Sequence, residues 1–351
     1  MTKMQVQTLN DTKTALRSVA ITTSARLHMG FFDLNGGLGR RFGSIGLSLK
    51  TPATSIEVSS ASTFTAEGEG AQRAIAIAQQ IASHLKVDGG VHIQLDQVIP
   101  EHAGLGSGTQ LSLAIGMAIN ILFKCDLSVN EIAILSQRGT RSGIGLGTFA
   151  KGGLIVDGGR ASKSLASKLK VPPVIACAEF PEDWPILLIF DKGHSGVHGD
   201  EELTAFQNLP PFPESSAALL CRHVLMQALP AIAERDLPAF GEAIQTLQAV
   251  TGDYFAPAQG GGRYTSQLVT LVLNQLQANG MHCFGQSSWG PTGFAVFADQ
   301  LEAETQLKQL NATFGPEQNL QFLLTRANNQ PSQILVNETL GNKKYYLELK
   351  E

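Results

Sequence analysis

A glycine-rich turn is the segment whose residue types most directly suggest chemistry. It reads Gly104-Leu105-Gly106-Ser107-Gly108 and stands between a predicted strand and a long apolar segment. Because glycines lack Cβ atoms, the backbone N–H groups of such a turn can close around an anion, and a following helix adds unpaired N–H groups and the positive end of its dipole. Ser107 and Thr109 can cap that helix or donate to phosphate oxygens. The turn predicts a phosphate site, with a plain capped turn as the alternative; it fits neither the P-loop nor the dinucleotide pattern.

Two other segments extend this pattern toward both ends of the chain. Residues 24–31 read SARLHMGF, and residues 285–293 read GQSSWGPTG. Together with the turn that follows Pro100, they resemble in order the three motifs of the GHMP superfamily, named for galacto-, homoserine, mevalonate and phosphomevalonate kinases. The resemblance implies an α+β protein with a ribosomal-protein-S5-like N-terminal domain and a ferredoxin-like C-terminal domain. It also implies that the third motif closes over the phosphate site.

One position departs from the kinase pattern. GHMP kinases commonly place an aspartate in a run such as Ser-Gly-Ile-Asp after the second motif, where it orients or deprotonates the attacking hydroxyl. The corresponding run here is Arg141-Ser142-Gly143-Ile144-Gly145, so Gly145 stands at that position. Glycine can neither take a proton nor bind a metal. The resemblance therefore implies a phosphate cradle without the kinase base; Gly108 also replaces a second serine that is usual in the second motif.

A subfamily fits this combination. Residues 26–30, 33–36, 43–47, 104–110, 141–145 and 285–292 resemble the β-ribofuranosylaminobenzene 5′-phosphate synthases. Those enzymes are decarboxylating pentosyltransferases that join 4-aminobenzoate, or 4-hydroxybenzoate in some members, to phosphoribosyl pyrophosphate. Carbon dioxide and pyrophosphate leave, and the product feeds tetrahydromethanopterin synthesis, which supplies a one-carbon carrier. The resemblance implies these small-molecule partners and no organic cofactor.

This reaction explains why a kinase base would be absent. The para substituent pushes electrons to the ring carbon that bears the carboxylate, and that carbon attacks the anomeric carbon of the ribose. Rearomatisation then loses carbon dioxide rather than a proton, so no strong base is required. The protein must instead stabilise the departing pyrophosphate, align the reactants and exclude water.

The resemblance also assigns residues. We expect catalytic roles for Arg26, His28, His102 and Arg141, although surface solvation is the alternative for an arginine and a structural role the alternative for a histidine. Trp289 could stack on the benzoate ring, but we favour packing beneath the turn. The residues expected to contact the substrates are Gly104, Leu105, Gly106, Ser107, Gly108, Thr109, Gln110, Ser142, Gln286, Ser287, Ser288 and Thr292.

A metal is an open question at this point. Pyrophosphate substrates usually travel with Mg²⁺, which keeps several waters and needs only one or two protein carboxylates. Asp33, Asp157 and Glu101 are the candidate ligands, and Glu201 and Glu202 are available for a metal or for the ribose hydroxyls.

Two other functions compete with the transferase. One is an ATP-dependent kinase of a small molecule, against which Gly145 argues. The other is a non-catalytic binding protein with the same fold, against which the retention of all three glycine-containing motifs argues.

Composition narrows the class of protein further. The chain has 351 residues and a formal net charge of -4, without a dense Lys/Arg block, so we expect no nucleic-acid partner. The N-terminus lacks the apolar core of a signal peptide, and we expect no membrane partner and a cytoplasmic location. The four cysteines are far apart in the sequence and predict reduced, buried thiols. We expect a homodimer, the commonest assembly of soluble enzymes.

Periodicity predicts a mixed order of helices and strands. Apolar spacing indicates helices over residues 71–85, 111–123, 215–234, 238–250, 265–279 and 301–310. Ser128 and Glu131 have the spacing of a capping box and predict the start of another helix. Strands are indicated at 55–59, 91–95, 154–156, 186–190 and 322–325, with a strand-turn-strand over 283–297. Without a strict βαβ rhythm, the order favours two α+β domains, which we place at residues 18–170 and 171–351.

Overall fold

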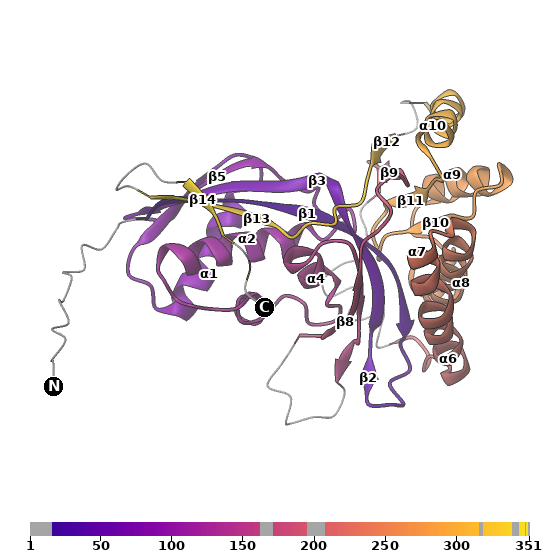
Figure 1. The fold of residues 1–351 in the computed structure, drawn as a ribbon, viewed down its shortest axis with the longest axis horizontal. Coiled ribbons are helices and arrows are strands. Elements are labelled where there is room, and N and C mark those ends of the chain that lie inside the picture. The colour runs from indigo at the N-terminus through magenta and orange to yellow at the C-terminus, as the bar shows by residue number, and fades with distance from the viewer. Residues whose placement is uncertain are drawn as a thin grey trace, which may run out of the picture.

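The computed structural model describes residues 16–161, 171–194, 208–315, 319–338, 344–347 and 349, and shows two parts side by side (Figure 1). Its strands are β1 Leu16–Asp33, β2 Arg40–Arg41, β3 Gly43–Ala61, β4 Thr65–Glu67, β5 Gly90–Gln97, β6 Leu154–Asp157, β7 Arg160–Ala161, β8 Val174–Ala178, β9 Ile186–Asp191, β10 Cys283–Gln286, β11 Gly293–Val296, β12 Leu320–Thr325, β13 Gln333–Glu338 and β14 Lys344–Tyr346. Its helices are α1 Ala71–Leu85, α2 Ser107–Leu122, α3 Val129–Leu135, α4 Ile144–Ala150, α6 Glu214–His223, η1 Val224–Ala228, α7 Leu229–Glu234, α8 Leu237–Phe255, η2 Ala256–Ala258, α9 Gln267–Ala278 and α10 Gln300–Phe314.

The larger sheet is organised around two long neighbouring strands. Among the described residues it has eight strands, and β1 and β3 pair antiparallel over most of their 18 and 19 residues. Helices α1, α2 and α4 cover one face of this sheet (Figure 1). Val19 and Ile21 alternate with less buried neighbours and pack into the core beneath these helices, as the period of two in a strand requires. This core fixes where α2, which follows the glycine-rich turn, lies against β1.

The expected division at residues 170/171 does not separate the two sheets. β8, β13 and β14 follow residue 171 in the sequence, yet β13 pairs with β1, β14 with β13, and β8 with β6. The yellow C-terminal strands therefore run back along the N-terminal part (Figure 1). Pairing between strands so far apart in the sequence leaves no local signal. The sequence alone therefore could not show that strands after residue 171 belong to the larger sheet.

The second part confirms the expected α+β architecture. In the portion of the chain that the structure describes, its sheet has four antiparallel strands in the order β10-β11-β9-β12. Val272 and Leu276 of α9 and Leu310 of α10 join its core. Helix α8 packs against both β10 and β1, so it joins this part to the larger sheet.

Local signals in the sequence placed several helix ends well. Helix α1 spans Ala71–Leu85, as the apolar spacing predicted. Ser128 and Glu131 form the capping box at the start of α3, each side chain accepting a hydrogen bond from the other residue's backbone N–H. The predicted helix over residues 215–234 is one helical segment, Glu214–Glu234, in which the π-helical turn η1 connects α6 and α7. It is long and apolar enough, by length and composition alone, to cross a membrane, a test that core helices of soluble proteins also pass.

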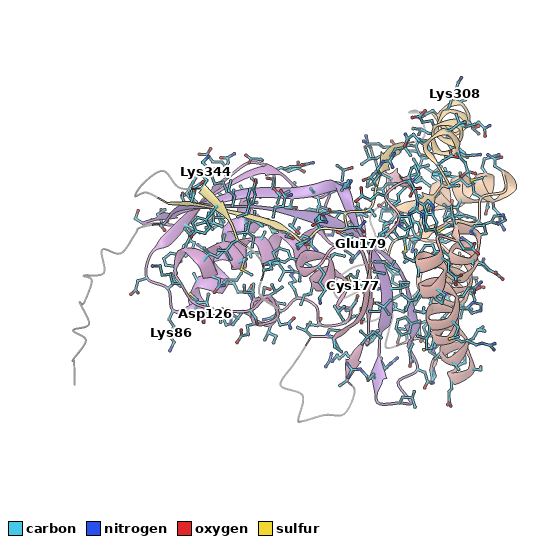
Figure 2. The ribbon with its side chains drawn as sticks, viewed as in Figure 1. Lys86, Asp126, Cys177, Glu179, Lys308 and Lys344 are labelled. Carbon is cyan, nitrogen blue, oxygen red and sulfur yellow. The ribbon has the colours of Figure 1, made fainter. Side chains whose placement is uncertain are left out.

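Charged side chains are distributed over both parts of the molecule. Figure 2 shows Lys344 on the larger sheet, Lys308 on α10 at the other side, and Cys177 and Glu179 between them, within and just after β8. Cys177 is exposed, whereas Cys283 is buried. The expectation of buried thiols is therefore wrong for Cys177, because it lies on the outward side of a sheet-edge strand.

A buried carboxylate closes β6 onto the start of α4. Asp157 is fully buried and accepts hydrogen bonds from the Gly143 and Gly159 backbone N–H groups at 3.0 and 2.8 Å, and from the Ser142 and Ser44 hydroxyls. Burial raises the pKa of Asp157 to about 6, because removal from water opposes ionisation more strongly than these donors favour it. The folded protein thus holds this proton more tightly than the unfolded chain does.

Asp157→Asn should therefore flatten part of the pH dependence of stability. With the pKa raised on folding, the contribution of Asp157 to the free energy of unfolding is fully present below about pH 4 and is lost as the pH rises through about 6. Between these pH values, the difference in the free energy of unfolding between the wild type and Asp157→Asn should change by up to about 1.4 kcal/mol per pH unit. Urea unfolding of both proteins across this range measures it; a constant difference would show that Asp157 titrates normally.

Candidate functional site

The three glycine-containing segments meet in space, although they are far apart in the sequence. The Ser287 hydroxyl donates to the Gly104 carbonyl at 2.8 Å and accepts the His28 backbone N–H at 3.1 Å. The Ser288 backbone N–H donates to the His28 carbonyl at 3.0 Å. Ser287 is completely buried, so it joins the segments and does not face a ligand. The predicted closure of the third segment over the turn is thereby formed by the Ser287 hydroxyl together with backbone groups.

Two glycines allow this contact. Gly104 has φ +76°, and a Cβ atom there would lie 2.8 Å from Gly290 Cα. A Cβ atom on Gly290 would in turn collide with Gly104. Because neither position has room for a side chain, the two turns approach with bare backbones.

Helix α2 begins directly after the turn and has no side-chain cap. Its N-cap residue is Gly106, at φ 82°, so Thr109 is not the N-cap. The first backbone N–H groups, those of Ser107 and Gly108, have no acceptor within the helix. Ser107, Gly108 and Thr109 are each partly accessible. This helix end, which we call the cradle (residues 104–109), can bind an anion.

Arg26 lies directly on the cradle. Its guanidinium Nη1 donates to the Gly104 carbonyl at 2.5 Å, and the Leu105 carbonyl accepts the Arg26 backbone N–H at 3.0 Å. A Cβ atom on Gly106 would lie 2.9 Å from Arg26 Cγ, so a glycine is needed here to admit the arginine. The structure thus brings Arg26 to the phosphate site, where the sequence placed it.

Two further arginines reach the cradle from other elements. A Cβ atom on Gly108 would collide with the Arg73 guanidinium and would lie 3.3 Å from Arg138 Nη1. Arg73, on α1, also pairs with Glu101 at 2.5 Å. Burial and the neighbouring charge of Arg73 lower the pKa of Arg138, and no described carboxylate lies within ion-pair distance of it. An anion at the cradle would offset this repulsion.

Sequence reasoning missed Arg73, and it offered Arg138 only as one of several cations near the motifs that could bind phosphate. Arg73 stands on a helix with no motif of its own, so nothing local marks it. The available signal was Gly108, where the kinase pattern has a serine: the missing side chain makes the space that the Arg73 guanidinium occupies.

Gln110, predicted to contact substrate, is part of the core. It is completely buried. Its Nε2 donates to the Gly145 carbonyl at 2.8 Å, and its Oε1 accepts the Thr23 hydroxyl. Both ends of the amide are thus used to join α2 to α4 and β1.

Gly145 lies in α4, opposite the first turn of α2. A Cβ atom there would lie 3.0 Å from Thr109 Cγ2 and 3.8 Å from Gln110 Nε2. Because Gly145 has an ordinary helical backbone, space and not backbone strain limits this position. A carboxylate at 145 would point toward the cradle, so its absence removes a negative charge from the anion site.

Ser142 and Arg141 precede α4, and the Ser142 hydroxyl contacts other residues of the fold. The Ser142 hydroxyl is hydrogen-bonded to Ser44 at 2.9 Å and donates to Asp157 at 3.2 Å. These hydrogen bonds hold Ser142 against β3 and β6, and its role toward the phosphate stays a prediction. Arg141, half-buried, precedes it at the turn into α4.

His28 is buried beside the cradle. Its side chain is about 3% exposed, and neither ring nitrogen has a hydrogen-bond partner. Burial, followed by the positive charge of Arg26, lowers the pKa of His28 to about 3. The imidazole is therefore neutral at physiological pH, with one N–H donor and one nitrogen acceptor.

His28 lines a pocket with aromatic walls. Phe31, Phe255 and Trp289 line it together with Ser288. Trp289 is buried and packs edge-on against Phe255, with ring centroids 4.6 Å apart, so the predicted packing role is confirmed, although the residue also borders the pocket. Aromatic rings pack well against flat ligands, but the cavity here has a volume of about 40 Å³, so a benzoate enters only if the lining side chains move. We call this space the aromatic pocket.

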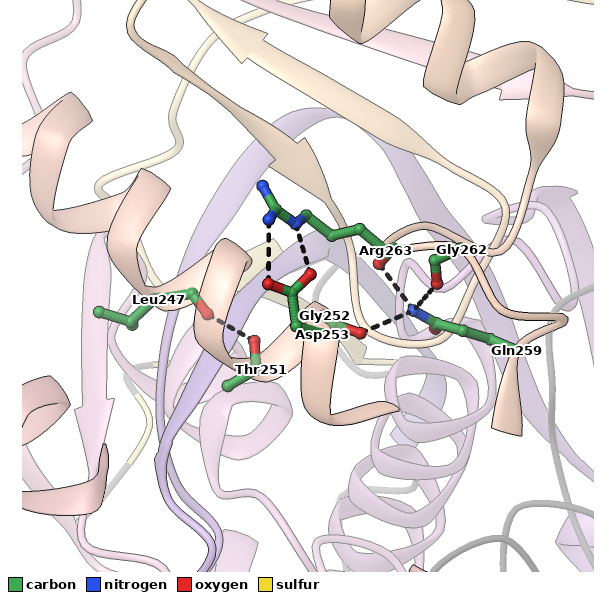
Figure 3. Close-up of polar contacts among 7 residues, drawn as sticks. All are labelled: Leu247, Thr251, Gly252, Asp253, Gln259, Gly262 and Arg263. Atoms are coloured by element: carbon green, nitrogen blue, oxygen red, sulfur yellow. Dashed lines mark hydrogen bonds and ion pairs between the residues drawn. The ribbon is translucent and has the colours of Figure 1, made fainter. Parts of the chain in front are cut away.

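Other lining residues come from the end of α8 and the turns after it. Gln259 and Arg263 line the aromatic pocket, and Figure 3 shows their contacts. Arg263 is paired with Asp253 at 2.8 and 3.0 Å. Gln286, another predicted contact residue, also borders the pocket, but its Oε1 accepts both N–H and O–H of Thr265 and its Nε2 donates to the Ser288 carbonyl.

His102 lies in a different pocket from His28. It is exposed and near Glu101, at 3.9 Å, and it borders a second pocket with Lys192 and Thr292. The Thr292 hydroxyl is buried without a hydrogen-bond partner. The structure does not bring the two histidines predicted to be catalytic together.

The candidate metal ligands do not converge. Asp157 is used in the β6–α4 contact, Asp33 accepts the Asn35 and Gly36 backbone N–H groups, and Glu101 pairs with Arg73. Among the described residues, no three acidic, histidine or cysteine side chains form a metal-binding group. Glu201 and Glu202, the other acidic residues considered for a metal, lie outside the described residues.

Comparison with known proteins supports the same assignment. Residues 72–152 match the GHMP kinases N terminal domain, and residues 228–315 match the GHMP kinases C terminal domain. The structure of homoserine kinase from Cytophaga hutchinsonii superimposes with a TM-score of 0.64 at 15% identity, covering 95% of this chain and 100% of that one. The fold is therefore that of the GHMP kinases.

Sequence relatives are more specific. The chain is 34% identical to the beta-ribofuranosylphenol 5′-phosphate synthase of Archaeoglobus fulgidus, over 90% of this chain and 99% of the relative. It is 33% identical to the protein of the same name from Methanocaldococcus jannaschii, over 88% of this chain and 98% of the relative. With its cradle and aromatic pocket in the GHMP fold, the chain belongs to the beta-ribofuranosylphenol 5′-phosphate synthase family.

Proposed function

We propose that this protein joins 4-hydroxybenzoate to phosphoribosyl pyrophosphate, releasing carbon dioxide and pyrophosphate, in methanopterin biosynthesis. The observation that carries the proposal is the gathering of Arg26, Arg73 and Arg138 at the cradle, beside an aromatic pocket. The two spaces match the two reactants, a polyanion and a flat aromatic acid. Replacing the carboxyl group of 4-hydroxybenzoate by the ribosyl carbon gives a ribofuranosylphenol, the product in the relatives' name; 4-aminobenzoate would give the aniline.

The reaction needs few functional groups from the protein. The ring carbon that bears the carboxylate forms a bond to ribose C1′, while the bond from C1′ to the pyrophosphate oxygen breaks and its electron pair leaves with pyrophosphate. The carboxylate then departs as carbon dioxide, and the electrons of that bond restore the aromatic ring. Atoms and charges balance in this reaction without an oxidant and without a base.

The described residues divide this work between them. The cradle N–H groups and the arginines stabilise the departing pyrophosphate, because charge on a leaving group is best met by donors already in place. The rings of Phe31, Phe255 and Trp289 hold the acceptor and exclude water. His28, neutral and next to Arg26, borders the pocket on the side joined to the cradle.

The kinase alternative is disfavoured by the same geometry. Gly145 supplies no carboxylate opposite Thr109, where an attacking hydroxyl would need one. Gly108 and Arg73 also give the cradle more positive charge than the serine form of the motif would.

We also propose that the enzyme acts in the cytoplasm as a homodimer. Leu219, Leu225 and Met226 expose 44%, 63% and 67% of their area along α6 and η1, an apolar strip that suits a second copy. Light scattering should give twice the mass of the chain, and Met226→Lys should shift the mass toward that of a monomer. A monomeric wild type would refute the dimer.

The proposed reaction makes a direct prediction. Purified protein given both phosphoribosyl pyrophosphate and 4-hydroxybenzoate should form the ribosylated phenol, with carbon dioxide and pyrophosphate in equal amounts, and neither substrate alone should react. Mass spectrometry and a pyrophosphate assay measure this. ATP-dependent phosphorylation of a small alcohol without riboside formation would support the kinase instead.

Arg138→Gln should weaken the sugar substrate selectively. Loss of a hydrogen bond to a charged group, about 1.5–3 kcal/mol, corresponds to a KM for phosphoribosyl pyrophosphate raised about tenfold or more, with little change in the KM for 4-hydroxybenzoate. Lys308→Gln on α10 removes the same charge far from the cradle (Figure 2) and should leave both constants unchanged. Equal effects on both KM values would show that Arg138 only supports the fold.

A further inference from the structure

One side chain in the aromatic pocket has an orientation that its surroundings fix. Nε2 of Gln259 donates to three backbone carbonyls, those of Gly252 at 3.3 Å, Gly262 at 2.9 Å and Arg263 at 2.6 Å (Figure 3). Only the amide nitrogen can donate to carbonyl oxygens. The side chain therefore cannot turn over without bringing its own oxygen against these acceptors.

The other end of the same amide is left unused. Oε1 of Gln259 is buried and has no hydrogen-bond partner, and the residue as a whole is about 9% exposed. A buried acceptor without a donor is costly, by more than a typical hydrogen bond contributes when it is made. Because Gln259 lines the aromatic pocket, a ligand in that pocket is the available source of a donor.

A second glutamine in the pocket shows that this state is not general. Gln248 also lines the pocket, but its Nε2 donates to the Met29 and Gln286 carbonyls and its Oε1 accepts the Gln286 N–H at 2.9 Å. Both ends of the Gln248 amide are hydrogen-bonded within the fold, whereas Oε1 of Gln259 has no donor.

We infer that Gln259 Oε1 accepts the para O–H of the aromatic acceptor and thereby selects acceptors that carry a donor at that position. This inference rests on the proposed function and names the group that recognises its substrate. A carbonyl oxygen accepts from a phenol O–H or an aniline N–H, but not from a carboxylate, which has no proton to offer. The para group thus points to Gln259, and the carboxylate end points to the part of the pocket bordered by His28.

The same contact would strengthen during the reaction. As the para oxygen pushes electrons into the ring, it becomes more positive and its O–H becomes a better donor. The fixed, partly negative Oε1 then meets charge that develops only at the transition state, which raises the rate as well as the affinity. Gln259 would therefore influence kcat along with the choice of acceptor.

The test compares two ligands that differ in one donor. 4-Fluorobenzoate approximates 4-hydroxybenzoate in size but cannot donate. Calorimetric titration of the full chain, with inorganic pyrophosphate present, should show 4-hydroxybenzoate binding about tenfold more tightly. In Gln259→Leu the ratio of the two affinities should fall to about one.

The ratio separates recognition from a loss of structure, because a distorted pocket weakens both ligands alike. Gln245→Leu is the matched control: Gln245 also donates to a backbone carbonyl, that of Phe284 at 2.5 Å, but it does not line the pocket, so its variant should keep the wild-type ratio. Should Gln259→Leu fail to fold, the wild-type ratio alone decides, since equal affinities for the two ligands overturn the inference.

The outcome is also separable from the proposed reaction. A wild type that forms the riboside but shows no preference for 4-hydroxybenzoate, or a Gln259→Leu variant that keeps the preference, refutes the role of Gln259 and leaves the transferase intact. A preference that depends on Gln259, without riboside formation, supports the recognition and refutes the transferase.

Discussion

The contact between the Gly104 and Gly290 backbones is the constraint on which the rest of the site depends. It brings the turn at residues 104–108 and the segment 285–293 within van der Waals distance. The Ser287 hydroxyl then hydrogen-bonds to both Gly104 and His28. Because His28 borders the aromatic pocket, these hydrogen bonds connect the pocket to the cradle. A methyl group at either glycine would separate the turns and with them the two substrates.

The charge at the cradle decides which chemistry the site favours. In a kinase of this fold, a carboxylate near the phosphates positions a hydroxyl. Here the chain has glycine at both positions that would place side chains there: Gly145 omits the acid and Gly108 admits Arg73. Both changes make the site more positive, which stabilises an anionic leaving group and offers nothing to deprotonate an alcohol.

Local sequence signals predicted much of the fold and half of the site. The α1 boundaries, the capping box of Ser128 and the position of Arg26 followed from spacing and motif alone. Pairing of β13 with β1 did not, because strands distant in sequence carry no mark of their partner. Arg73 and Gln259 were missed for the same reason: their roles come from tertiary contacts with Gly108 and with three carbonyls. The hydrogen bonds that Gln110 and Ser142 make within the fold were not predicted, because a polar residue in a glycine-rich motif looks the same in sequence whether it faces a ligand or the core.

The neutrality of His28 fits a reaction that must expel carbon dioxide. A carboxylate leaves as carbon dioxide more readily when no cation holds its negative charge, and a protonated histidine would form such an ion pair in a buried pocket. Burial and Arg26 lower the pKa of His28 to about 3, so the imidazole stays uncharged over the whole range in which the protein would work. It can still donate one hydrogen bond and orient the carboxylate. The positive charge beside this part of the site thereby stays on Arg26 at the cradle, where pyrophosphate departs, and not on His28.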